Sequence, residues 1–154
     1  MSLDTMIARC TVALVNAKRK LQTLQIRMLA GELKDDVEHV EPYGYTSCPQ
    51  PGAEGVAVFP GGDRSHGVVI VIADRRFRLQ GLKPGEVALY TDEGDKLHFE
   101  RGNKLTIQTA NLVVKASESV DFQTPVLTHN GVNVGETHAH GGVERGNDNS
   151  SGPH

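Results

Sequence analysis

A short repeat of apolar pairs runs through the C-terminal third of the chain. The two residues of each pair stand at positions i and i+2, and mostly polar or small residues separate them. Because alternate residues of a strand point to the same face, each pair predicts one short strand with one apolar face. The gaps "RGN", "TAN", "SES", "TP" and "HNG" are typical of turns. The pairs are Leu97/Phe99, Leu105/Ile107, Leu112/Val114, Val120/Phe122, Val126/Thr128 and Val132/Val134.

This repeat predicts an assembly of several chains. Successive pairs begin 8, 7, 8, 6 and 6 residues apart, which leaves room for one strand and one turn per unit. Two apolar side chains per strand bury too little area to offset an ordering cost of about 1–2 kcal/mol per residue. Three copies around a threefold axis would bury every pair and join strands between chains, so we expect a homotrimer. The alternative is one more antiparallel sheet on the barrel that the preceding residues are expected to form, which explains the alternation but not why the repeat continues unbroken to the terminal histidines.

The repeat leads into the segment "ETHAHGGV", in which His138 and His140 would lie on one side of an extended strand. One chain would offer two imidazoles, whereas zinc usually takes four ligands and an octahedral ion six. Three chains on an axis would offer six, which fits an octahedral ion such as Fe(II) and fits tetrahedral zinc poorly. The glycines Gly141 and Gly142 would let the chain reverse at the tip.

The other histidines lack ligand spacing. Four of them, His39, His66, His98 and His154, lie far apart in the sequence. His129, in the "HNG" turn, is expected to be solvated or to contact the metal-ligating side chains without binding the metal itself.

Residues 9–90 read as short strands linked by turn residues. The strand segments are "RCTVALVNA", "LQTLQIRML", "VAVF" and "VVIVIA", and the second would also suit one face of a helix. Four or five strands in about 70 residues favour a small closed or partly closed barrel, with an OB-like barrel as the best match. We therefore expect an all-β protein: an OB-fold-like barrel over 9–90, a trimeric shaft over 91–135 and a metal-bound tip over 136–154.

Composition narrows the possible partners. The net charge is −3 and aromatic residues make up 5% of the chain, which argues against nucleic-acid binding by an OB module. Cys10 and Cys48 form no disulfide framework, so synthesis in a reducing cytoplasm is expected. No signal peptide and no apolar run of about 18 residues is present, so we expect a protein made in soluble form.

An enzyme is the strongest alternative function. The spacing H-x-H-x3-E, completed by Glu144, matches part of a cupin-type metal site with open coordination positions. That site needs another histidine from a later strand, and only His154 follows. We therefore expect no enzymatic activity. The "DEGD" segment at 92–95 could bind calcium but is expected to be an exposed turn.

Several stretches in order resemble a known family. They are "AGELKDDVEHVEPYGYTS", "VAVF" and "GVVIVIADRRFRL" around "PGGDRSHG", "LKPGEVALYTDEGD" and "THAHGGVERGNDNSSGP". Together they resemble the baseplate spike protein of Mu-type contractile-tailed bacteriophages, from about residue 10 to 154. Members of that family usually carry a longer N-terminal segment before the barrel, so a truncated or prophage-encoded version is among the expectations.

The resemblance implies a fold and a mechanical function. In that family an OB-fold barrel attaches to the baseplate hub, and a trimeric β-helix narrows to a tip where an HxH strand binds one axial iron ion. Carried over, the ligands would be His138 and His140 of three chains, and the iron would be structural. The resemblance further implies a virion protein, assembled in the bacterial host cytoplasm, that pierces the host outer membrane when the sheath contracts.

Overall fold

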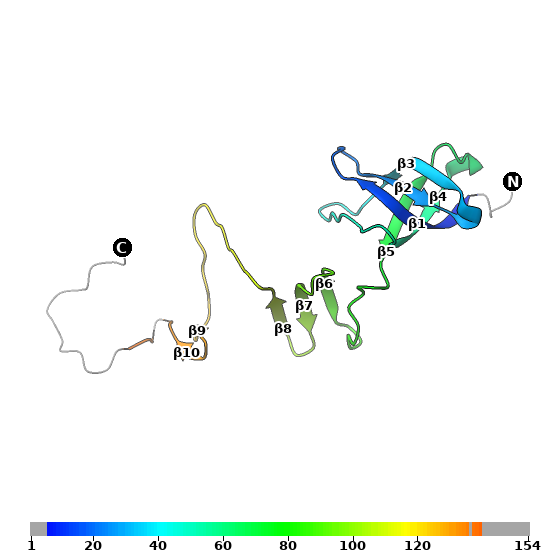
Figure 1. The fold of residues 1–154 in the computed structure, drawn as a ribbon. Coiled ribbons are helices and arrows are strands. Elements are labelled where there is room, and N and C mark those ends of the chain that lie inside the picture. The colour runs from blue at the N-terminus through cyan, green and yellow to red at the C-terminus, as the bar shows by residue number, and fades with distance from the viewer. Residues whose placement is uncertain (1–5, 136, 140–154) are drawn as a thin grey trace. The chain divides into compact units, whose positions relative to one another are not determined.

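The computed structural model describes residues 6–135 and 137–139, which fold almost entirely as β-structure (Figure 1). The expected all-β class is therefore confirmed. The chain divides into two units, Met1–Asn111 and Leu112–His154. The strands are β1 (Ile7–Asn16), β2 (Thr23–Arg27), β3 (Leu33–His39), β4 (Glu54–Val58), β5 (Val68–Ala73), β6 (Val87–Tyr90), β7 (Lys96–Glu100), β8 (Lys104–Gln108), β9 (Thr128–His129) and β10 (Val132–Asn133), with short 3-10 helices η2 (Leu29–Gly31) and η3 (Pro60–Gly62).

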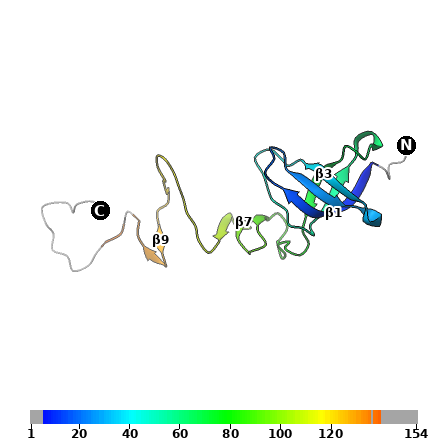
Figure 2. The ribbon, with the colours of Figure 1, turned by 45° about the horizontal axis from the view of Figure 1, so that its top comes forward.

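The first five strands form a closed barrel in the order β1-β2-β3-β5-β4 (Figures 1 and 2). All neighbouring strands are antiparallel except β3 and β5, which run parallel. Strand β1 shows why the barrel forms, because Cys10 and Val12 point inward while Arg9 and Thr11 point outward. Phe59, which follows β4, is fully buried, and burial of one such side chain contributes about 1.5–3 kcal/mol. The barrel core comprises Cys10, Val12, Leu24, Ile26, Met28, Val37, Ala53, Ala57, Phe59 and Val69.

A bulge in β5 turns one valine to the outside of the barrel. Val69 pairs with Ala57 and Val71 with Val56, so Ile70 is the extra residue in β5. The inward positions are therefore Val69, which is fully buried, and Ile72, which packs against the core. As a result Val71, which strict alternation from Val69 would place inside, is 52% exposed.

Strand β3 was not among the strands named from the sequence pattern. Only Val37 and His39 of its seven residues are buried, and the rest are charged or exposed. An irregularity opposite Gln25, with Asp36 at a φ of 53°, interrupts the two-residue alternation. The segment 21–29 contains a strand, β2, so its helical interpretation was wrong.

Strands β6, β7 and β8 form a separate antiparallel sheet. The link between β7 and β8 is Arg101-Gly102-Asn103, with positive φ at Gly102 and Asn103, so the "RGN" segment is a turn as predicted. Strand β6 precedes the predicted shaft boundary at residue 90 in the sequence, but it pairs with β7, which follows that boundary. The division of the chain at residues 90 and 135 stays a prediction.

In the second unit the only strands among the described residues are β9 and β10, which form a hairpin. Its two turn residues, Asn130 and Gly131, have φ values of 49° and 81°. Positive φ at both central residues is the requirement of a type I′ turn, which asparagine followed by glycine meets. The "HNG" segment is therefore a turn, as expected. The segments around Leu112/Val114 and Val120/Phe122 form no strand pairing within the described part of this single chain.

Candidate oligomerisation face and metal-binding strand

One face of the β6-β7-β8 sheet is entirely apolar. The register places Val87, Phe99 and Leu105 side by side in one row. Leu89, Leu97 and Ile107 form a second row two residues along each strand, and therefore on the same face. Five of these six side chains are 50–61% exposed, and Leu97 is half-buried. We call these six residues the apolar face. Among the residues that the structure describes, none covers it.

The opposite face of the same sheet is polar and internally paired. The Glu86 carboxylate accepts hydrogen bonds from the backbone N–H groups of Lys83, at 2.9 Å, and Arg101, at 3.1 Å. Its Oε2 atom lies 3.3 Å from Nε2 of His98, which is an ion-pair distance but without hydrogen-bond alignment. The backbone hydrogen bonds, that from Lys83 first, hold the pKa of Glu86 below its usual value. The Glu86 side chain is only 6% exposed, so the polar face is better covered than the apolar one.

Apolar side chains are also exposed in the second unit. Apolar residues of the repeat from Leu112 onward are exposed in the single chain, with Val134 the least exposed at 46% and Leu112 and Val114 the most at 64%. The remaining exposed apolar members are Val120, Phe122, Val126 and Val132. The sequence predicts that these side chains point inward, but the described residues of one chain offer no surface against which they could pack.

His138 is held in place by a small backbone network. Its backbone N–H donates to the carbonyl of Gly135 at 2.9 Å, and its Nδ1 lies 2.8 Å from the carbonyl oxygen of Asn133. Asn133 also accepts from the Gly135 N–H through Oδ1 at 3.0 Å and donates through Nδ2 to the Thr137 hydroxyl at 2.7 Å. A carbonyl can only accept, so Nδ1 carries the proton and the lone pair of a neutral imidazole lies on Nε2. This is the arrangement usual for metal-ligating histidines.

The second predicted ligand, His140, lies outside the described residues, as do Gly141, Gly142, Glu144 and His154. Whether His138 and His140 share one side of a strand therefore stays a prediction. Within residues 6–135 and 137–139, no group of three or more His, Cys, Asp or Glu side chains could hold a metal ion.

The remaining described histidines each have a local setting. His39 is buried in the barrel wall, and His66 is exposed beside Asp63. His98 lies next to Glu86 and His129 is exposed in β9. The "DEGD" segment lies in the turn between β6 and β7, as expected, where the Thr91 N–H donates to the carbonyl of Asp95 at 3.0 Å.

Sequence reasoning missed two parts of this arrangement. The pair Val87/Leu89 has the i, i+2 spacing of the repeat and directly precedes a turn, so the same signal could have found it. The pairing of Glu86 with His98 joins the residue just before β6 to a residue of β7, and it leaves no local signal. In the part of the chain that the structure describes, no helix is long and apolar enough to cross a membrane.

Comparison with known proteins identifies the family. Residues 9–76, which contain strands β1 to β5, match the family described as "Bacteriophage Mu Gp45, N-terminal". The chain is 37% identical over 136 residues to the Mu-like prophage FluMu protein gp45 of Haemophilus influenzae, covering 84% of this chain and 74% of that relative. The chain belongs to the Mu gp45 family. The predicted resemblance to Mu-type baseplate spike proteins is thereby confirmed.

A second relative in the gp45 family carries a functional name. The chain is 36% identical over 126 residues to the "Baseplate puncturing device gp45" of Escherichia phage Mu. The match covers 82% of this chain but 64% of that relative, so the chain spans less than two thirds of the phage Mu protein. Both matches are longer than residues 9–76, so the similarity to gp45 proteins continues beyond the barrel.

Proposed function

We propose that this protein is the central spike of a contractile phage tail baseplate: a homotrimer that pierces the host outer membrane when the sheath contracts. The observation that carries the proposal is the apolar face of the β6-β7-β8 sheet, which lies uncovered beside a polar face that is internally paired. The name of the phage Mu relative, a puncturing device, supports the same role.

Trimerisation is the proposed reason for the exposed apolar face. Three copies of the face around an axis would bury 18 apolar side chains, six from each chain, that one chain leaves in water. Strands β6 and β8 each pair only with β7 among the described residues, so each has one open edge. A neighbouring chain would cover these edges. Beyond β8 the exposed repeat residues would continue the same packing as a trimeric β-helix.

The proposed tip holds one iron ion through His138 and His140 of three chains. The donor set suits this role, because the contact between Nδ1 of His138 and the Asn133 carbonyl directs the lone pair to Nε2. Six imidazoles would fill an octahedral sphere, so the ion would be structural and would leave no position for a substrate. Structural metal binding is worth on the order of 10 kcal/mol, which would prevent three narrow chain ends from fraying.

The barrel is proposed to be an OB-fold that attaches the spike to the baseplate hub. Support comes from its five strands, the order β1-β2-β3-β5-β4 and the single parallel contact between β3 and β5. The protein would then reside in the virion tail, assembled in the bacterial cytoplasm from a phage or prophage gene. A rigid tip at one end and an attachment module at the other are what a piercing device requires.

Native mass spectrometry with elemental analysis of the full chain tests this proposal. We expect three chains and one iron per particle. The double variant His138→Ala/His140→Ala should lose the metal and remain trimeric, because the apolar face and the repeat hold the chains together. A matched control is His66→Ala, an exposed histidine in the barrel unit that should keep the metal. A monomeric wild-type protein, or full metal content in the double variant, would contradict the proposal. Binding of azide by the iron would indicate an open, enzyme-like site instead.

A further inference from the structure

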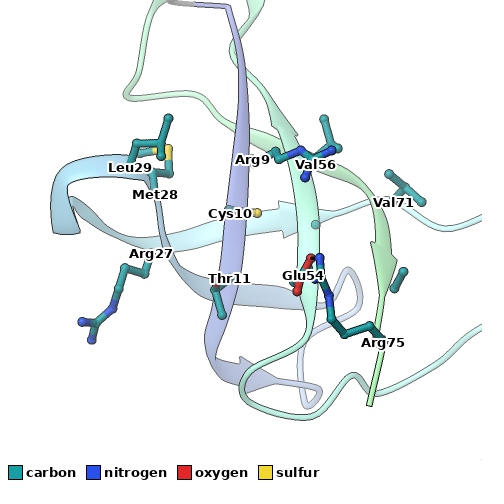
Figure 3. A pocket seen from close by; sticks show the side chains of 12 residues that line it. Arg9, Cys10, Thr11, Arg27, Met28, Leu29, Glu54, Val56, Val71 and Arg75 are labelled. Atoms are coloured by element: carbon teal, nitrogen blue, oxygen red, sulfur yellow. Dashed lines mark hydrogen bonds and ion pairs between the residues drawn. The ribbon is translucent and has the colours of Figure 1, made fainter. Parts of the chain in front are cut away.

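The outer wall of the barrel carries a groove to which the proposed function assigns no role (Figure 3). It has a volume of about 480 Å³ and is formed by η2 and strands β1, β2, β4 and β5. The register places Arg9, Val56 and Val71 side by side across β1, β4 and β5. A second row, two residues along each strand, consists of Arg27, Thr11, Glu54 and Ala73. Both rows face outward, because the residues between them, such as Cys10, point into the core.

The floor of this groove is apolar although it faces solvent. Val71 reaches it only because the bulge at Ile70 turns that valine outward. Leu29 of η2 is 81% exposed and lies beside Met28 at one side of the groove (Figure 3). Bulges often re-aim side chains next to functional sites, and exposed apolar patches with polar rims are typical of interaction surfaces.

The rim of the groove carries an excess of positive charge. Arg75 is compensated, because its Nη2 lies 2.6 Å from Oε2 of Glu54 (Figure 3). Among the residues that the structure describes, no carboxylate lies within 4.0 Å of Arg9 or Arg27. Glu54 is the one acidic residue in the lining. A guanidinium group binds a carboxylate through two parallel hydrogen bonds, so the rim offers two ready positions for carboxylates.

We propose that this groove binds an extended acidic segment of another baseplate protein, whose carboxylates and apolar side chains lie on the same face of the segment. The inference rests on the proposed baseplate role and adds the surface and the chemistry of the partner. Carboxylates would pair with Arg9 and Arg27, and apolar side chains would cover Val56, Val71 and Leu29.

Two other occupants fit the groove less well. No aromatic side chain lines it, so bases of a nucleic acid would find no stacking platform. A symmetric contact with the same groove of a second copy would set arginines against arginines.

Fluorescence anisotropy on the full chain, with labelled eight-residue peptides, tests the groove. The acidic probe has glutamate and an apolar residue, valine or leucine, in turn at every second position and serine between them, so that both kinds of side chain lie on one face. One comparison peptide has lysine for glutamate, and another has serine at every apolar position. We expect the acidic apolar peptide to bind, and the other two to bind roughly tenfold more weakly or not at all. Arg9→Glu/Arg27→Glu should weaken binding of the acidic probe roughly tenfold or more, and Leu29→Ser by a smaller factor.

The matched control is Lys18→Glu/Lys20→Glu, which makes the same change of charge at exposed positions outside the groove and should bind as the wild type does. No binding of the acidic probe at about 1 mM, equal binding of the lysine peptide, or an unchanged affinity in Arg9→Glu/Arg27→Glu would overturn the proposal. Equal binding of a 20-nucleotide single strand would also overturn it, in favour of a nucleic acid.

Native mass spectrometry of the same samples separates failure of the groove proposal from failure of the spike proposal, because the groove variants should remain trimeric. Loss of the trimer in Arg9→Glu/Arg27→Glu would assign the groove to a contact between copies and overturn the inference.

Discussion

The barrel and the three-stranded sheet place their apolar side chains in opposite ways. The barrel closes on itself, and its ten core residues are at most 6% exposed within one chain. The sheet pairs its polar side chains internally and leaves its apolar face in solvent. Since burial of apolar area drives folding, the barrel can be stable alone, whereas the sheet depends on surfaces that the described part of one chain does not supply. Substitutions in the two regions should therefore fail in different ways.

The largest effect is expected from Ile107→Asp in the apolar face. Three carboxylates would meet near the proposed axis without partners, and burying unpaired charges is strongly unfavourable. We expect loss of the trimer in analytical ultracentrifugation, with the barrel still folded by circular dichroism. The control is Gln108→Asp, which introduces the same charge at the neighbouring exposed position on the other face of β8. A stable trimer in Ile107→Asp would show that this face does not point to an axis.

A pair of phenylalanine truncations sharpens the comparison. Phe59 is fully buried in the barrel, whereas Phe99 is 50% exposed in the apolar face of one chain. Phe59→Ala should lower the free energy of unfolding by about 3–5 kcal/mol, independently of protein concentration. Phe99→Ala should lower the melting temperature mainly at low protein concentration, because it weakens association. Concentration-dependent thermal melts distinguish the two, and a concentration-independent loss of under about 1 kcal/mol in Phe99→Ala would mean that Phe99 stays exposed.

A smaller effect is expected from Glu86→Gln on the polar face. The N–H groups of Lys83 and Arg101 donate to different oxygens of the carboxylate, whereas a glutamine has one carbonyl oxygen, so it can accept at only one of these positions and loses the charge that strengthens both hydrogen bonds. The pKa of Glu86 is lowered in the folded protein, so its contribution is present above the unfolded pKa and is lost as pH falls through the folded one. Thermal melts should therefore show the variant less stable than wild type at pH 7, with the difference shrinking toward pH 3. A difference that does not depend on pH would contradict this account.

Local sequence patterns predicted much of the fold, but they did not predict the places where the regular alternation of a strand is interrupted. Strands β1, β2, β4 and β5 and the "RGN" and "HNG" turns follow from alternation and turn chemistry, which depend on residues close in sequence. Strand β3 and the outward position of Val71 depend on bulges, which change the period without a clear sequence signal. The apolar face was partly predictable, because each strand shows its own pair, but its arrangement in two rows is set by register. The metal-binding strand was predicted from the histidine spacing together with its position after the repeat and the two glycines that follow, and only His138 of its two histidines is described.

The smallest expected effect concerns His39, the buried histidine of the barrel. Burial lowers its pKa below 6.5, and the negative charge of Glu41 partly opposes this shift. Gln22 also lies beside the imidazole, with its Nε2 atom 3.4 Å from Nδ1. Since the folded state favours the neutral ring, the unfolded state binds more protons just below pH 6.5. Stability should therefore fall as pH decreases from 6.5 toward the folded pKa, by at most about 1.4 kcal/mol per pH unit.

The variant His39→Gln removes this titration while keeping a polar side chain at the position. Thermal melts between pH 7.5 and about 5 should show a flatter dependence in the variant than in the wild type. Carboxylates with lowered pKa values, such as Glu41, lose their stabilising charge only at lower pH, so they should not contribute in this range. If the stability of wild type and variant depends on pH with the same slope, the barrel tolerates a charged His39. The barrel wall around β3 is then less tightly closed than the burial of His39 indicates.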